Sequence, residues 1–164
     1  MINNITVSFI YFVKGLLFCF LTIISLVKEA MRLGAFEYMF FSKGLGLKAA
    51  LGVLIHGLLE LTAIIIASGA GIVLGKSFLF PGTIRRIDSL KQGAKDGVKI
   101  VVGLVPVFIV AAFFEGFITP MYRMPVVLNL GILLISFIFI IWYFIIYPVR
   151  LSKKLPLLLN EEEA

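Results

Sequence analysis

Cysteine and charged residues are scarce in this chain of 164 residues. Its single cysteine, Cys19, excludes a small secreted fold held together by disulfides. Charged residues make up only 15% and hydrophobic residues 61%, whereas soluble domains carry about 25% charged residues. A chain of this size could not bury so much apolar surface in water, and its 16 phenylalanines exclude a disordered chain. The composition therefore predicts an integral membrane protein, with the lipid bilayer as its first partner.

Four hydrophobic stretches are long enough to cross a bilayer, which takes roughly 20 mostly apolar residues. They cover residues 5–27, 49–74, 98–118 and 126–147. Their uninterrupted apolar runs do not alternate as the strands of a membrane β-barrel do, so we expect helices. The sequence predicts an all-α fold, a polytopic transmembrane helix bundle with four full spans, in a single membrane domain over residues 1–164.

Two further segments are expected to be helical without spanning. Residues 33–41 are apolar and aromatic but too few to cross, and they contain Glu37. We expect a half-inserted or interfacial helix there, with a hydrophobic loop as the alternative. After Pro81 and Gly82, apolar residues recur at helical spacing, which predicts an amphipathic helix over residues 84–97 that lies on the cytoplasmic membrane surface and runs into the third span. The alternative is that this helix is a surface for docking a partner.

Basic residues flank the predicted spans unevenly. The loop over residues 75–97 and the C-terminal tail together carry eight lysines and arginines, while the loops on the other side carry five. The positive-inside rule then places the 75–97 loop and the C-terminus in the cytoplasm, in a multi-pass protein of the cell membrane. Because these flanking residues explain the formal net charge of +6, we do not expect nucleic acid as a partner.

Ionisable residues inside the spans are the candidate functional residues, because they are costly in a bilayer. His56 and Glu60 are four residues apart and so share one helix face, and Glu115 near the end of the third span lies at a similar depth. We expect these three side chains to meet in an intramembrane polar cluster, with Lys14 as a candidate partner of Glu60. Small residues on the same face would let a neighbouring helix approach closely and form a helix-packing stripe: Gly52, Ala63, Ala67, Gly71 and Gly75.

The polar cluster has three competing interpretations. It fixes helix packing through buried hydrogen bonds, it is part of an ion or proton route, or its imidazole and two carboxylates bind zinc. The chain lacks the His-Glu-x-x-His arrangement of metalloproteases, and neither Ser68 nor Cys19 has an evident base beside it. We therefore expect no catalytic residue, no metal and no cofactor.

Three short motifs occur one after another along the chain, and together they indicate a family. The segments His56-Gly57-Leu58-Leu59-Glu60, Phe80-Pro81-Gly82 and Glu115-Gly116-Phe117-Ile118-Thr119-Pro120 resemble the stage II sporulation protein M family of integral membrane proteins. The resemblance covers roughly residues 2–123. It adds Gly57, Gly116 and Thr119 to the candidate supporting residues.

The resemblance implies a function but no chemistry. In spore formers the named member of the family is a membrane scaffold that assembles a peptidoglycan-degrading complex. The expectation here is a non-enzymatic scaffold that organises other membrane or envelope proteins, with a homo-oligomer as a further expectation. The alternative is a small ion- or proton-coupled channel or transporter subunit that uses His56, Glu60 and Glu115.

Overall fold

In the computed structural model, residues 2–17, 19–118 and 125–153 are described, and every element in these ranges is helical. This confirms the all-α prediction. The chain divides into two units, Met1–Arg123 and Met124–Ala164. The first unit contains α1 (Ile2–Lys14), α2 (Phe20–Phe41), α3 (Gly46–Leu79), α4 (Arg86–Gly103), α5 (Val105–Phe113) and the π-helical turn η1 (Phe114–Ile118). The second contains α6 (Val126–Ile141) and η2 (Trp142–Ile146).

The first predicted span, residues 5–27, is two helices rather than one, so this prediction is wrong. α1 ends at Lys14, and the backbone N–H groups of Gly15, Leu16 and Leu17 bond to carbonyls three residues earlier, a tightening that is common at helix ends. The chain then reverses, and Cys19, whose φ of 62° is left-handed, precedes α2. The break falls where a basic residue is followed by glycine, a typical end of a helix.

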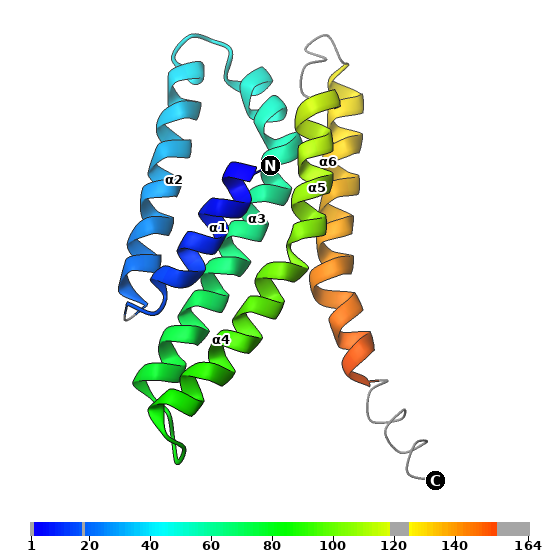
Figure 1. The fold of residues 1–164 in the computed structure, drawn as a ribbon. Helices are drawn as coiled ribbons and strands as arrows, with labels where there is room; N and C mark the ends of the chain where they lie inside the picture. Colours follow the sequence, from blue (N-terminus) through cyan, green and yellow to red (C-terminus); the bar gives the residue numbers. More distant parts are fainter. Residues whose placement is uncertain (1, 18, 119–124, 154–164) are drawn as a thin grey trace. The chain divides into compact units, whose positions relative to one another are not determined.

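Among the helices before α3, the one too short to cross a bilayer is α1, not the segment 33–41. That segment is the C-terminal half of α2, whose 22 residues are about 33 Å long, whereas the 13 residues of α1 reach only about 20 Å. The prediction of a separate half-inserted or interfacial helix at 33–41 is therefore wrong, because the helix that begins at Phe20 continues without a break. α1 lies against α3, and α2 runs antiparallel to α3 (Figure 1).

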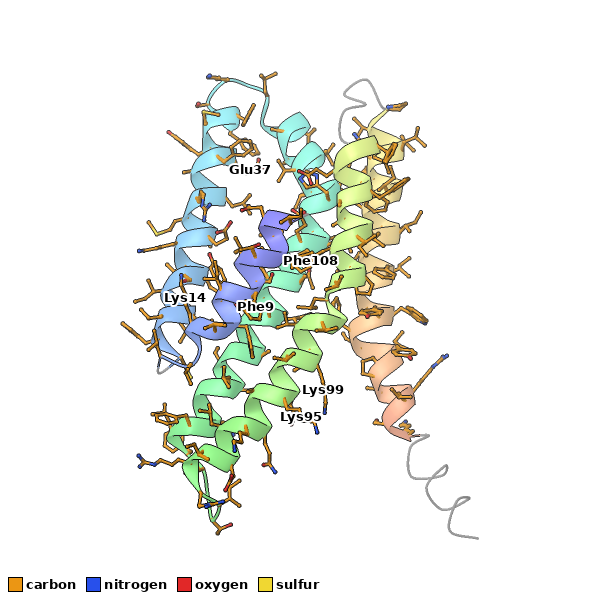
Figure 2. All side chains as sticks on the ribbon, viewed as in Figure 1. Phe9, Lys14, Glu37, Lys95, Lys99 and Phe108 are labelled. Atoms are coloured by element: carbon orange, nitrogen blue, oxygen red, sulfur yellow. The ribbon has the colours of Figure 1, made fainter. Side chains whose placement is uncertain are left out.

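The helices α3 and α4 form a long antiparallel hairpin, and α4 passes through Leu104 into α5 (Figure 1). The helix predicted over residues 84–97 is present and continues to Gly103 towards the third predicted span, but it packs lengthwise on α3 instead of lying apart on a surface. The reason is a buried row of small residues at every fourth position, Ser89, Gly93 and Gly97. Gly93 lies against Ser77 and Leu74 of α3, and Gly97 lies against the Phe12 ring of α1. Lys95 and Lys99 point away from α3 (Figure 2).

Three helical stretches in the described part of the chain are long and apolar enough to cross a membrane: Ala49–Leu79, Arg86–Ile118 and Val126–Lys153. They contain the second, third and fourth predicted spans, and they make this a membrane protein. Four full spans are not confirmed, because α1 is too short and α2 carries four charged residues within its 22.

Direct backbone contact joins α1 to α3. A Cβ atom at Gly15 would overlap the main chain of Gly71, and one at Gly75 would overlap the carbonyl oxygen of Gly15. At Gly71 a Cβ would lie 2.8 Å from the carbonyl oxygens of Tyr11 and Phe12. Side chains larger than hydrogen are excluded here, so these glycines set how closely α1 approaches α3.

We predict that Gly71→Ala destabilises the first unit by about 1–3 kcal/mol, because the added methyl group meets rigid backbone. The matched control is Gly69→Ala on the same helix, where a Cβ would meet nothing within 4 Å. The control is expected to be neutral or slightly stabilising, since alanine favours helix. Thermal unfolding in detergent measures both variants, and equal melting temperatures would contradict the close contact.

Candidate functional site

Polar side chains hold α1 and α2 together. The Tyr11 hydroxyl lies 3.1 Å from Oε2 of Glu29 and 3.3 Å from the carbonyl oxygen of Ser25, so it can donate to either. The Lys14 ammonium donates to Oγ of Ser25 at 2.9 Å, and the Thr22 hydroxyl donates to the carbonyl oxygen of Tyr11 at 3.0 Å. These bonds join residues 11 to 18 positions apart in sequence and fix the angle of the α1–α2 hairpin.

Lys14 pairs differently from the expectation that it would meet Glu60. Its ammonium lies 5.2 Å from the centre of the Tyr11 ring, a cation–π distance, and it bonds to Ser25 on α2. Figure 2 shows Lys14 near the end of α1, beside α2. Its role in the structure is therefore to join these two helices. Sequence reasoning missed the partners Tyr11, Ser25 and Glu29, because only the break after Lys14 brings them face to face.

The predicted cluster residues lie on two neighbouring elements. His56 and Glu60 are one turn apart on α3, and both are half-buried. Glu115 lies in η1, which packs against α3, and it is exposed. Oε1 of Glu60 is buried and has no hydrogen-bond partner in the described structure. That all three side chains meet remains a prediction.

The candidate supporting residues lie on the same two elements. Gly57 is buried on α3, whereas Gly116 is exposed in η1 with nothing within 4 Å of a Cβ placed there. Thr119 lies outside the described residues. In the described ranges, no three His, Cys, Asp or Glu side chains form a group that could hold a metal ion. The zinc interpretation of the cluster thus finds no support in the structure.

The small residues of α3 have two environments. Ala63 and Ala67 are fully buried, and Gly71 and Gly75 carry the backbone contact with α1. Gly52, in contrast, is only half-buried and has open space around it. The C-terminal part of the stripe, Gly71 and Gly75, is therefore a helix–helix contact within one chain.

A groove of about 410 Å³ separates α2 from α3. It is lined by α2 residues between positions 26 and 33 and by Leu61, Ile64 and Ile65 of α3. The α2 residues that line it are Leu26, Val27, Glu29, Ala30 and Leu33. Glu29 is the polar residue of this lining, and its carboxylate also pairs with Arg32 at 2.5 Å. The lining residues show which parts of the two antiparallel helices lie at the same level: residues 26–33 of α2 are beside residues 61–65 of α3.

Comparison with known families decides the classification. The family model for Stage II sporulation protein M matches residues 1–120, almost three quarters of the chain. The chain belongs to this family. Searches of curated proteins and of solved structures give no match. The match confirms the resemblance based on the His56-Gly57 and Glu115-Gly116 motifs, and it covers the helices from α1 to η1.

We predict that Tyr11→Phe lowers the stability of the α1–α2 hairpin by about 1–2 kcal/mol, because Glu29 and Ser25 lose a hydrogen-bond donor. Tyr38→Phe is the matched control, since the Tyr38 side chain on α2 is 74% exposed. Chemical unfolding in detergent, followed by circular dichroism, measures both. The proposed role of Tyr11 is wrong if the two variants unfold at the same denaturant concentration.

Proposed function

We propose that this chain is a non-enzymatic membrane scaffold that organises other membrane or envelope proteins. Membership of the stage II sporulation protein M family supports this, although it does not identify the partners. The structural observation that carries the proposal is the use of polar groups: Tyr11 and Lys14 of α1 bind Glu29 and Ser25 of α2. Such bonds stiffen a bundle, and a rigid bundle can hold partners in a fixed arrangement.

The proposed location is the cell membrane, with the loop between α3 and α4 and the C-terminus in the cytoplasm. If each of the three apolar stretches crosses the membrane once, the α3–α4 loop and the end of the third stretch lie on the same side. That side carries eight lysines and arginines over the 75–97 loop and the C-terminal tail. The positive-inside rule supports a cytoplasmic assignment for both. Association of further copies through exposed apolar helices is compatible with this arrangement.

The scaffold proposal predicts that a small, reproducible set of envelope proteins copurifies with the full chain after crosslinking in native membranes. Glu115→Gln should recover the same proteins, because a scaffold needs no titratable group in η1. Membranes that carry the chain without crosslinker are the control. Recovery of the chain alone, in several mild detergents, would contradict the proposal.

A second candidate function, an ion- or proton-coupled channel or transporter subunit, is favoured by the buried and unpartnered carboxylate oxygen of Glu60. His56 and Glu115 would line the same route. Carboxylates inside membrane spans are typical groups of ion and proton routes.

The transport alternative predicts proton or cation flux in proteoliposomes of the wild-type chain, and loss of that flux in Glu60→Gln. Asp96→Asn is the control, since Asp96 is an exposed partner of Lys99 on α4. Fluorescent dyes inside the vesicles report the flux. If the wild-type chain carries no flux, the transport alternative is rejected.

A further inference from the structure

Three of the four charged residues of α2, Lys28, Glu29 and Arg32, lie at the level of the middle of α3. The groove between the antiparallel helices places α2 residues 26–33 beside α3 residues 61–65 (Figure 1). The apolar stretch Ala49–Leu79 of α3 has Ile64 at its centre. Lys28 and Arg32 therefore lie within about 5 Å of mid-span along the helix axis.

Both basic side chains face away from α3. Lys28 is two residues beyond Leu26, about 200° around the helix from that groove-lining residue, and it is exposed. No hydrogen bond or ion pair engages its ammonium within the described residues. Arg32 has a side chain that is 72% exposed and one ion pair, with Glu29, whose carboxylate also binds Tyr11. The outward face thus carries more positive charge than its own carboxylate can balance.

The fourth charged residue of α2, Glu37, has the opposite orientation. Glu37 lies on the same helix face as Leu33, and Figure 2 places it on the side of α2 towards α3. Its Oε2 atom is buried. The acidic residue is therefore turned into the bundle while Lys28 and Arg32 are turned out.

Acyl chains are a poor environment for this face. Charged side chains at the middle of a membrane face a protein interior or a partner, and lysine and arginine reach the headgroups only from near the helix ends. On the same face, Ala35 is three residues beyond Arg32 and is exposed. Small residues of this kind let a second helix approach closely.

We propose that the outward face of α2, defined here as Lys28, Arg32 and Ala35, docks a transmembrane helix of a different protein that carries a carboxylate near its midpoint. The carboxylate pairs with Lys28 and shares Arg32, while the partner backbone packs over Ala35. This inference rests on the proposed scaffold function and names the chemistry of the partner.

Other occupants fit the face less well. A second copy related by an axis normal to the membrane meets the face at equal depth, so Lys28 and Arg32 would oppose their own like charges. The residues of α6 contain no acid, so that helix cannot supply the carboxylate. Lipid phosphates lie about 15 Å from the middle of the bilayer, beyond the reach of these side chains.

The test uses a synthetic transmembrane peptide of leucine and alanine with one central aspartate, and matched peptides with asparagine or leucine in its place. Energy transfer between each labelled peptide and the labelled full chain is measured in phosphatidylcholine vesicles. We expect the aspartate peptide to bind roughly five- to tenfold more tightly than the leucine peptide. Equal binding of these two peptides would overturn the proposal.

Variants locate the binding on α2. Lys28→Met should reduce binding of the aspartate peptide towards that of the leucine peptide, and Lys28→Arg should retain it. The matched control is Lys43→Met, because Lys43 is exposed in the turn after α2 and far from mid-span. Unchanged binding by Lys28→Met, or an equal loss in Lys43→Met, would overturn the assignment to this face. Melting temperatures in detergent show that each variant is folded.

The same variants in native membranes separate this inference from the scaffold function. If wild-type chain recovers partner proteins and Lys28→Met combined with Arg32→Met recovers all of them in equal amounts, the docking face is wrong and the scaffold stands. If wild-type chain recovers none, the scaffold fails, and the aspartate peptide alone decides whether α2 binds an acidic helix. Selective loss of a partner with a central intramembrane carboxylate supports the proposal.

Discussion

The contact between the backbones of Gly15 and Gly71 is the constraint on which the first unit depends. Helices normally pack 8–10 Å apart because side chains separate them, and only glycine lets main chain touch main chain. This contact, continued at Gly75, ends α1 against α3 and returns the chain as α2. The bonds of Tyr11 and Lys14 to α2 then fix the hairpin, so the position of α2 beside α3 follows from it.

The position of α2 explains a conflict in the chain. Its four charged residues exclude it from the helices that are apolar enough to span, yet its groove with α3 places it at the middle of a spanning stretch. Glu29 and Glu37 face the bundle, where Tyr11 binds Glu29, whereas Lys28 and Arg32 face outwards. A helix of this composition is stable at that depth if a partner covers its charged face. Such dependence on a partner is what a scaffold requires, and it unites the fold with the proposed function.

Much of this architecture could be predicted from the sequence, because long apolar stretches have few alternatives to helix in a bilayer. Hydropathy identified α3, the α4–α5 helix and α6, and the small residues at Gly71 and Gly75 indicated a close helix contact. The break after Lys14 could not be predicted from hydropathy, because apolar residues continue on both sides of it. The basic residue followed by glycine, Lys14-Gly15, was the available sign of a helix end. The missed break hid the pairing of Tyr11 with Glu29 and assigned residues 33–41 to a separate helix. The family could be recognised from the His56-Gly57 and Glu115-Gly116 motifs, but whether His56, Glu60 and Glu115 meet depends on side-chain geometry that periodicity does not determine.

The depth of α2 in the bilayer is the most direct test of this account. Nitroxide labels attached in turn at Met31 on α2 and Ile65 on α3, with Cys19 replaced by alanine, report depth through their collision rates with oxygen and with a water-soluble nickel complex. Because residues 26–33 lie beside residues 61–65, the account predicts that both labels are deep and similar in depth. A label at Met31 that behaves as if it were at the membrane–water boundary, while the label at Ile65 is deep, would contradict it.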